Sequence, residues 1–173
     1  AEVTFITTTT CLPETVGMDV IHADTATEMK KAVAGAVKDA DALIMAAAVA
    51  DYQPKSEVMF NFFCPLKPFS LELVRTPDIL AEVKGEIVKV GFAAESDDIV
   101  ASAQRKLKEK GLDLIVANDI TAQDSGFGAD TNKVTIIDKS GKIESLPLLT
   151  KREVADRVLD RVVGFLTKPQ RIS

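Results

Sequence analysis

The sequence has 173 residues, of which 46% are hydrophobic and 27% are charged, and its formal net charge at pH 7 is −5. This length and composition are typical of one soluble globular domain with a sizeable core, and the acidic balance disfavours generic nucleic-acid binding. No apolar run is long enough to cross a bilayer, and we expect no signal peptide. The two cysteines, Cys11 and Cys64, lack the spacing of metal ligands, so we expect free thiols in a reducing, cytoplasmic compartment.

Strand-like and helix-like segments alternate along the chain. This alternation predicts a Rossmann-like α/β fold, a three-layer αβα arrangement in which helices cover a mostly parallel sheet and a β-hairpin lies near the C-terminus. The predicted strands are residues 3–8, 16–23, 42–47, 70–74, 87–94 and 112–117, and the hairpin pairs residues 133–138 with 142–146.

The burial expected for the strands differs along the chain. Residues 42–47 have no alternating polar face, which is typical of a strand buried on both sides in the middle of a parallel sheet. Residues 70–74 alternate and predict a half-buried strand. Residues 52–69 look like a long loop with three prolines and four phenylalanines. An interface or a lid is the favoured role for this loop, and a strand pair inside it is an open alternative.

Capping residues predict where the helices begin and end. Thr25, Thr76, Ser96 and Thr150 are the predicted N-caps, and Glu28 and Glu153 complete capping boxes in the first and last helices. The first helix is expected to end near Asp39, and Gly111 with Leu112 to stop the third. The predicted buried stripe of the last helix is Val154, Val158, Leu159, Val162 and Leu166.

The beginning of the chain departs from the usual Rossmann pattern. Such a domain opens with a strand, a glycine-rich turn and a helix, whereas this sequence begins on a strand with no such turn ahead of it. We therefore expect the first strand–helix unit to be missing and treat residues 1–173 as one N-terminally truncated domain. Neither a GxGxxG nor a Walker A sequence is present, so a dinucleotide or P-loop site of those types is not supported.

Small residues follow the third predicted strand and lead to an aspartate. Residues 46–50 read Ala-Ala-Ala-Val-Ala and precede Asp51. Small side chains let a ligand approach the backbone closely, and open α/β sheets bind ligands at the carboxyl ends of their strands. A buried strand that runs into a tight loop is the alternative reading. Residues 74–77 and 91–95 are two further features at strand ends that could converge on the same crevice.

Two lysines lie on the helix that follows the second of these features. Lys106 and Lys110 are four residues apart and therefore share one helical face. They could hold a polyphosphate as point charges. The residues alone favour a structural reading, in which these lysines and Lys108 complement the dipole at the helix C-terminus. Asp78, at the start of the preceding predicted helix, likewise suits the helix dipole without any ligand.

Several strings occur together in the order found in one enzyme family. The chain resembles bacterial phosphopantothenoylcysteine synthetases, which form the C-terminal half of bifunctional coenzyme A biosynthesis flavoproteins. The resemblance implies a Rossmann-like three-layer domain that dimerises and a fused or associated flavin-dependent decarboxylase domain. It is carried by residues 47–52 (AAVADY), 76–80 (TPDIL), 90–95 (VGFAAE), 112–119 (LDLIVAND) and 126–132 (GFGADTN).

The resemblance also implies a reaction and its ligands. CTP activates 4′-phosphopantothenate, pyrophosphate leaves with the help of Mg2+, and L-cysteine attacks the resulting acyl cytidylate to give the amide and CMP. Such a reaction depends on positioning and charge stabilisation more than on covalent catalysis by the protein. The resemblance assigns no metal ligand on the protein. The implied nucleotide-binding residues are Met45, Ala46, Ala47, Asp51, Val74, Arg75, Thr76, Pro77, Phe92, Lys106 and Lys110.

Two departures from the family pattern bear on catalysis. The family's Asn-x-Ser-Ser-Gly segment would precede Ala1, and its Lys-x-Lys-Lys stretch is replaced here by residues 61–64, Asn-Phe-Phe-Cys. Lys67 is the candidate catalytic substitute, with Lys55 as the other possibility. Two alternatives stay open beside the ligase. One is a catalytically impaired nucleotide-binding or dimerisation fragment of this family, and the other is a Rossmann-like redox domain.

Overall fold

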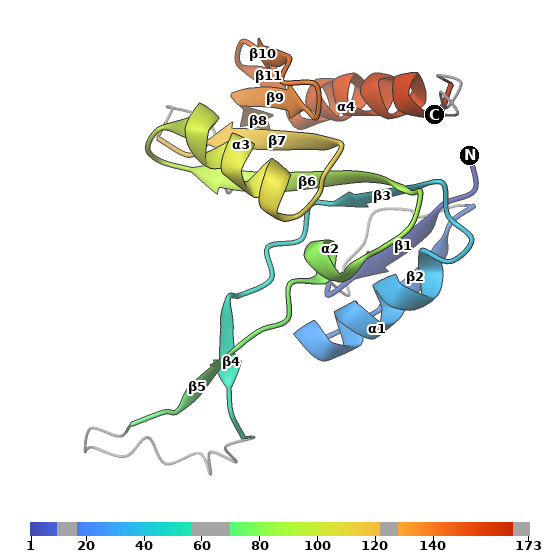
Figure 1. The fold of residues 1–173 in the computed structure, drawn as a ribbon, viewed down its shortest axis with the longest axis vertical. Coiled ribbons are helices and arrows are strands. Elements are labelled where there is room, and N and C mark those ends of the chain that lie inside the picture. Colours follow the sequence, from blue (N-terminus) through green and yellow to red (C-terminus); the bar gives the residue numbers. More distant parts are fainter. Residues whose placement is uncertain (10–16, 57–69, 122–127, 168–173) are drawn as a thin grey trace. The chain divides into compact units, whose positions relative to one another are not determined.

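The computed structural model describes residues 1–9, 17–56, 70–121 and 128–167 (Figure 1). The chain splits into two compact units. The smaller unit consists of Ala1–Val33 and Ala48–Asp78, and the larger unit consists of Ala34–Ala47 and Ile79–Ser173. In the ranges described, no helix is long and apolar enough to cross a membrane.

The larger unit contains a five-stranded mixed sheet with the strand order β10-β9-β7-β6-β3. Three strands run parallel, namely β3 (Ala42–Met45), β6 (Val88–Glu95) and β7 (Leu114–Asp119). Two antiparallel strands complete the sheet, β9 (Val134–Asp138) beside β7 and β10 (Ile143–Ser145) beside β9. The predicted mixed α/β class with its C-terminal hairpin is confirmed.

The turn of that hairpin depends on a glycine and a carboxylate. Gly141 has φ of +89°, a left-handed conformation that costs a glycine little. Asp138 accepts hydrogen bonds from the hydroxyl of Ser140 and from the backbone N–H groups of Ser140 and Lys142. Burial by itself would raise the pKa of the Asp138 carboxyl, but these hydrogen bonds outweigh it and lower the pKa below its usual value.

Helix α4 (Lys151–Leu166) begins at the predicted capping box. Thr150 Oγ1 accepts the Glu153 N–H at 3.2 Å, and Glu153 Oε2 accepts the Thr150 N–H at 2.9 Å. Each bond satisfies a backbone donor that the first turn of a helix leaves unpaired. The Thr150 hydroxyl also donates to Glu153 Oε2 at 2.7 Å. This hydroxyl and then the Thr150 N–H lower the pKa of the Glu153 carboxyl.

Replacing Thr150 with alanine is expected to lower the melting temperature at pH 7 by about 2–4 °C. Because the folded-state pKa of Glu153 lies below its ordinary 4.5, the ionised carboxylate stabilises the fold above that pH. This contribution is lost as the pH falls through the lower, folded-state pKa. The effect of Thr150→Ala should therefore shrink between pH 7 and about pH 3. Melting curves at both pH values measure the change.

Thr167 provides the matched control, because its hydroxyl donates to the Val163 carbonyl oxygen at 2.8 Å. Its replacement by alanine removes a helix-end hydroxyl from the same helix without touching a carboxylate, so its effect should not follow the Glu153 titration. Equal pH dependence in Thr150→Ala and Thr167→Ala would contradict the assigned cause.

Only part of the predicted stripe of α4 is buried. Val154, Val158 and Val162 are buried as predicted, and Val158 has 2% of its surface exposed. The prediction is wrong for Leu159 and Leu166, which are 49% and 46% exposed. Residues at i, i+4 and i+8 form a narrow stripe on a helix, and Leu159 follows Val158 directly, which turns its side chain away from the sheet.

Helix α3 (Ile99–Glu109) covers the other face of the sheet, and its predicted N-cap is wrong. The cap is Asp98 rather than Ser96, because the Asp98 carboxylate accepts the Ala101 N–H at 3.4 Å. The predicted stop is confirmed, since Gly111 has φ of +59°. The backbone N–H of Gly111 bonds to the Lys108 carbonyl at 3.2 Å and that of Leu112 to the Leu107 carbonyl at 2.9 Å, which is a Schellman motif.

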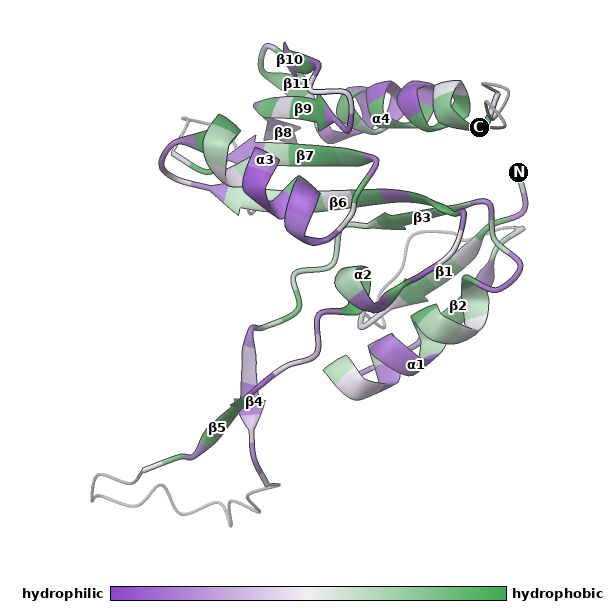
Figure 2. Cartoon of the chain, in the orientation of Figure 1, coloured by the Kyte–Doolittle hydropathy of each residue, from purple (hydrophilic) through white to green (hydrophobic). Residues whose placement is uncertain are grey.

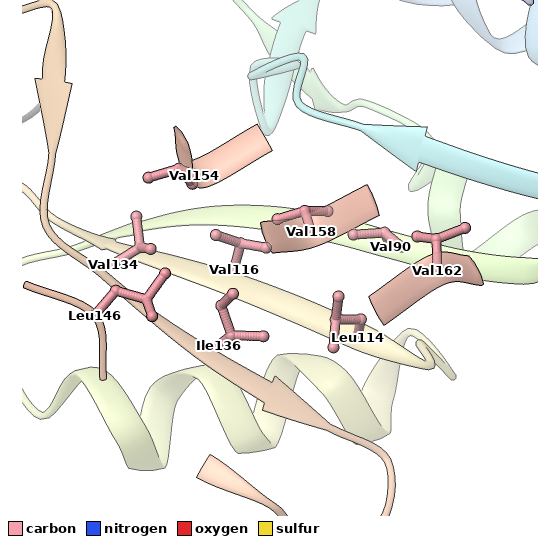
Figure 3. Packing of buried hydrophobic residues seen from close by; sticks show 9 residues of the cluster. All are labelled: Val90, Leu114, Val116, Val134, Ile136, Leu146, Val154, Val158 and Val162. Carbon is pink, nitrogen blue, oxygen red and sulfur yellow. The ribbon is translucent and has the colours of Figure 1, made fainter. Parts of the chain in front are cut away.

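Strand β7 contributes to the cores on both faces of the sheet. Leu114 and Val116 belong to the cluster that packs under α4 (Figure 3), whereas Ile115 and Ala117 belong to the cluster under α3. Consecutive side chains of a strand point to opposite faces. A continuous apolar run can therefore supply two cores, and Figure 2 shows most of β7 in the hydrophobic colour. This pattern gives the larger unit three layers.

The prediction that residues 42–47 form a central strand buried on both sides is wrong. Strand β3 ends the strand order, and among the described strands it pairs with β6 alone. Its side chains are half-buried or exposed, and Ile44 is 41% exposed. A run of small apolar residues does not distinguish the edge of a sheet from its middle, because burial is decided by which strands lie on either side.

Three short elements complete the larger unit. Helix α2 (Ile79–Glu82) is a single turn between β5 and β6 in the sequence. Strands β8 (Thr131–Asn132) and β11 (Leu149–Thr150) form an antiparallel pair that leads directly into α4. The backbone N–H of Lys151 also bonds to the Asp130 carbonyl at 2.9 Å, so the start of α4 is tied to the segment before β8.

The smaller unit contains a parallel strand pair and the beginning of a helix. Strands β1 (Thr4–Thr7) and β2 (Asp19–His22) pair in parallel. They correspond to the first two predicted strands. Helix α1 (Ala26–Ala36) starts at a capping box, in which Glu28 and Thr25 exchange hydrogen bonds of 3.0 and 3.1 Å. The helix ends earlier than the predicted Asp39.

The smaller unit also contains a two-stranded antiparallel ribbon, formed by β4 (Tyr52–Pro54) and β5 (Leu73–Arg75). The prediction of a half-buried strand at residues 70–74 is wrong in its bounds and its burial, because β5 begins at Leu73 and every one of its residues is exposed. Residues 57–69, which make up most of the predicted loop, lie outside the described residues. An exposed ribbon of two strands has little stability by itself.

Candidate functional site

In the larger unit, the end of β3 lies beside the middle of β6. Met45 pairs with Gly91 in the parallel register of these strands. Because the strands run in the same direction, Ala46 and Ala47 leave the sheet next to Phe92. Small side chains at this position expose backbone groups to anything that binds at the strand ends. This part of the predicted nucleotide-binding set is therefore contiguous within one unit.

Gly91 has a packing role beside these residues. A Cβ atom at Gly91 would lie 2.8 Å from Leu112 Cδ1 and 3.2 Å from Leu80 Cδ1. Contacts this short would force the two leucine side chains to move. The glycine of the VGFAAE string is thus explained by close packing of β6, with no ligand required.

Beyond Gly91, the side chains of β6 alternate between the two faces of the sheet. Phe92 packs against the cluster under α4, and Ala93 packs against the cluster under α3. The same alternation places Glu95 on the α3 side. Phe92 and the lysines of α3 therefore belong to opposite faces of the sheet, and a ligand that meets both must extend over the carboxyl end of β6.

Lys106 is held by a buried carboxylate at the end of β6. Its Nζ lies 2.7 Å from Glu95 Oε1, and the Ser102 hydroxyl donates to Glu95 Oε2 at 2.9 Å. Glu95 is 7% exposed, so its charge is compensated and hydrogen-bonded as a buried carboxylate requires. The side chain of Lys106 is 35% exposed, so part of it is open to solvent.

Lys110 lies one turn further along α3 and has a structural role at the helix end. It is the C-cap residue, and its carbonyl oxygen accepts a hydrogen bond from Lys89 Nζ at 3.1 Å. Lys106 and Lys108 lie in the last turn, where positive charge complements the helix dipole. The structural reading of these lysines and the phosphate-binding reading are therefore compatible.

The smaller unit brings together the other predicted nucleotide-binding residues. The Asp51 carbonyl oxygen accepts the Thr76 N–H at 2.9 Å, and Tyr52 pairs with Arg75 in the ribbon. Val74 pairs with Gln53 in the same register, and Pro77 follows Thr76 directly. Asp51 is exposed. The ribbon therefore places Asp51 beside residues 74–77, although they are distant in sequence.

The prediction that Thr76 caps a helix is wrong. Helix α2 begins at Ile79, two residues later than the predicted first position at Pro77. The Thr76 hydroxyl is buried, and it has no hydrogen-bond partner among the described residues. Buried polar atoms are almost always paired in native proteins. The hydroxyl can therefore hydrogen-bond to a water molecule or a ligand at this end of the ribbon.

Of the two candidate catalytic lysines, Lys55 alone lies among the described residues. Lys67 lies outside the described residues, as do residues 61–64. Lys55 lies just after β4 and forms an exposed ion pair with Glu72, with 2.7 Å between Lys55 Nζ and Glu72 Oε1. Exposed pairs of this kind stabilise a fold only slightly. In the part of the chain that the structure describes, no three His, Cys, Asp or Glu side chains gather to hold a metal ion.

Sequence reasoning missed the roles of Glu95 and Ser102. In the sequence, Glu95 stands out only as part of a string at a strand end, and no motif includes Ser102. A usable signal was present, because Ser102 and Lys106 are four residues apart and share a helical face. A carboxylate just ahead of that helix can reach both of them.

The fold of the larger unit, with small residues at its strand ends and a lysine of α3 held by Glu95, belongs to the Rossmann-like three-layer α/β class. Residues 1–166 match the DNA/pantothenate metabolism flavoprotein C-terminal domain. The chain belongs to this family.

Similar proteins agree with this assignment. Coenzyme A biosynthesis bifunctional protein CoaBC of Bacillus subtilis (strain 168) is 43% identical over 148 residues, which are 84% of this chain and 36% of that protein. A cysteine/cysteine sulfinic acid decarboxylase from an unknown prokaryotic organism is 39% identical over 171 residues, which are 96% of this chain and 48% of that protein. The chain thus spans less than half the length of these curated relatives.

A solved structure supports the same fold. The crystal structure of the C-terminal domain of a coenzyme A biosynthesis bifunctional protein CoaBC has a TM-score of 0.76 and 38% sequence identity to this chain. The match covers 95% of this chain and 76% of that one. The predicted Rossmann-like class is confirmed by this neighbour.

Proposed function

We propose that this chain is a phosphopantothenate–cysteine ligase domain that uses CTP in coenzyme A biosynthesis. The observation that carries the proposal is the set of strand ends in the larger unit, where Met45 pairs with Gly91, the neighbour of Phe92, and Glu95 at the end of β6 holds Lys106. The match of 38% identity to a CoaBC C-terminal domain supports it. We also propose a cytoplasmic location, as the predicted free thiols suggest.

The proposed reaction has two steps. The carboxylate of 4′-phosphopantothenate attacks the α-phosphorus of CTP, which forms the acyl cytidylate and releases pyrophosphate. The amine of L-cysteine then attacks the acyl carbon, which forms the amide and releases CMP. The protein contributes position and charge, with Lys106 of the larger unit next to the negative phosphates.

Mg2+ is proposed to accompany CTP. Since no cluster of metal-ligating side chains is present in the described ranges, we assign no protein residue to the ion. Magnesium is commonly held by substrate phosphates and water with few protein ligands. When bound, it would neutralise part of the triphosphate charge.

We propose that the domain acts as a homodimer. The ribbon of the smaller unit supports this, because Tyr52, Leu73 and Val74 expose large hydrophobic side chains on two short strands. Exposed apolar patches of this kind commonly mark protein interfaces. A fused or associated flavin-dependent decarboxylase domain is proposed as a further partner, since the bifunctional relatives are much longer than this chain.

A second candidate function is nucleotide binding without turnover. It is favoured by residues 61–64, which read Asn-Phe-Phe-Cys where the resemblance implies a lysine-rich stretch. The strand-end residues that would bind the nucleotide do not depend on that stretch. The two candidates therefore share CTP binding and differ in chemistry.

CTP with Mg2+ is expected to raise the melting temperature of this chain by about 5–10 °C at a concentration near one hundred times its dissociation constant. ATP with Mg2+ should raise it less, because the site is proposed to recognise the pyrimidine nucleotide. Differential scanning fluorimetry measures both shifts. Equal shifts for the two nucleotides, or none, would argue against the proposal.

Mass spectrometry separates the two candidates. Incubation with CTP, Mg2+ and 4′-phosphopantothenate should yield the acyl cytidylate and pyrophosphate if the chain is a ligase. A CTP-induced shift without any cytidylate would favour the binding domain that does not turn over.

A further inference from the structure

Glu95 has an unusually complete set of partners for a residue at a strand end. It is the last residue of β6, it is buried, and its two carboxylate oxygens bond to different side chains of α3. Oε1 meets Lys106 Nζ at 2.7 Å and Oε2 meets the Ser102 hydroxyl at 2.9 Å. Ser102 and Lys106 are one helical turn apart, so a single carboxylate spans both. The carboxylate therefore has little freedom to rotate.

We propose that Glu95 is a positioning residue for the nucleotide site, which fixes the ammonium group of Lys106 toward the phosphates, while Ser102 fixes Glu95. This inference rests on the proposed function, in which Lys106 meets the triphosphate of CTP. The geometry shows a lysine that is hydrogen-bonded to Glu95 and whose side chain is 35% exposed. Glu95 accepts one of the three N–H donors of the ammonium group, and the others can reach an incoming phosphate.

The physical advantage of this arrangement is preorganisation. A lysine side chain is a flexible four-carbon stem and loses rotational freedom when it binds a phosphate. A lysine that is already held in place loses less, so more of its interaction energy appears as affinity. The carboxylate holds Lys106 without consuming all its donors, and the buried environment of Glu95 keeps the contact short.

Glu95 also has an opposing effect, because its negative charge repels the phosphates. Replacing Glu95 with glutamine would remove the anchor and this repulsion together, and the two changes act in opposite directions on affinity. Replacing it with aspartate keeps the charge and shortens the side chain by one methylene. The carboxylate then cannot reach Ser102 and Lys106 at hydrogen-bonding distance together. Glu95→Asp therefore tests position separately from charge.

The test is a double-mutant cycle on binding of CTP with Mg2+, measured by calorimetry on the whole chain. Lys106→Met is expected to weaken binding about tenfold or more, and Glu95→Asp about threefold to tenfold. If Glu95 acts through Lys106, Glu95→Asp should add nothing in the Lys106→Met background. The matched control is Glu109→Asp, the same change at an exposed glutamate of α3, which should leave affinity unchanged.

Ser102 provides a second and milder arm that leaves every charge in place. Ser102→Ala should weaken CTP binding about twofold to threefold, and Ser102→Thr, which keeps the hydroxyl, should restore it. This arm carries the test if Glu95→Asp lowers the melting temperature so far that the protein does not fold. A hydroxyl that served only helix stability would change the melting temperature and not the affinity.

The possible outcomes separate the inference from the proposed function. Multiplicative losses in the cycle, or a Glu95→Asp effect no larger than that of Glu109→Asp, would overturn the positioning role and leave the CTP site intact. Wild-type affinity in Lys106→Met would overturn the contact between Lys106 and the triphosphate, and the inference with it. Weakened but measurable binding in Lys106→Met, with no further weakening in the double variant, supports both.

Discussion

Replacing Val158 with aspartate is expected to lower the free energy of unfolding by about 4 kcal/mol or more, a large share of the stability of a typical domain. Val158 lies in the middle of α4 and is 2% exposed in the cluster that α4 shares with β6, β7 and β9 (Figure 3). The substitution removes apolar burial and places a carboxylate among the hydrophobic side chains of that cluster. Urea unfolding followed by circular dichroism measures the loss.

The adjacent residue provides a strict control. Leu159→Asp introduces the same charge at the next position of the same helix, where the side chain is 49% exposed. Its cost should be below about 1 kcal/mol, mostly from the weaker helix propensity of aspartate. If Leu159→Asp proved as destabilising as Val158→Asp, the outward face of α4 would be buried in the working protein, and the assigned stripe would be wrong.

Replacing Leu114 with alanine is expected to cost about 2–5 kcal/mol. Leu114 is fully buried, with 0% of its surface exposed, and it lies in β7 at the centre of the sheet. The truncation loses the transfer free energy of the removed carbons and leaves a cavity, because neighbours on a rigid sheet relax only partly. Thermal and urea unfolding should both report the change, with little change in the urea m-value.

Leu148→Ala is the control for this truncation. Leu148 undergoes the same change of side chain in the same unit, but it is exposed, so its effect should be within about 0.5 kcal/mol. A similar loss of stability in both variants would mean that the loop before α4 is buried by a partner in solution. Because the change of side chain is the same in both variants, the difference between their losses of stability measures the effect of burial.

The parts of the larger unit that the sequence predicts well are those with local signals. The capping box at Thr150 and the stop at Gly111 depend on residues within one turn of each other. The hairpin around Gly141 depends on a tight turn between two apolar runs. Signals of this kind do not depend on how the rest of the chain folds.

Predictions that depended on distant neighbours were less reliable. Ile44 and Leu159 sit in apolar patterns that suggest burial, yet both are exposed, because a pattern does not say which element will lie against it. Asp113 is a polar residue that shows the same limit. Its carboxylate accepts hydrogen bonds from the Lys89 N–H at 2.8 Å and from Lys139 Nζ at 2.6 Å. These partners are 24 and 26 residues away, and no local rule connects them.

The candidate site was predicted in part for the same reasons. Small residues at strand ends pointed to the carboxyl edge of the sheet, and the parallel register of β3 and β6 places Met45 beside Gly91. The contact between Glu95 and Lys106 was not predicted, because it depends on the direction of two side chains from different elements. Which residues share an edge follows from topology, whereas which atoms touch requires coordinates.

The alternating side chains of β7 couple the unfolding of the two helix layers in the larger unit. Because one strand fills both hydrophobic layers, neither helix can detach without exposing a strand on which the opposite helix also depends. Damage to the α4 layer should therefore propagate to α3 and to the lysine that it carries. Substitutions far from the strand ends can then weaken the phosphate contacts, because they cause the larger unit to unfold cooperatively.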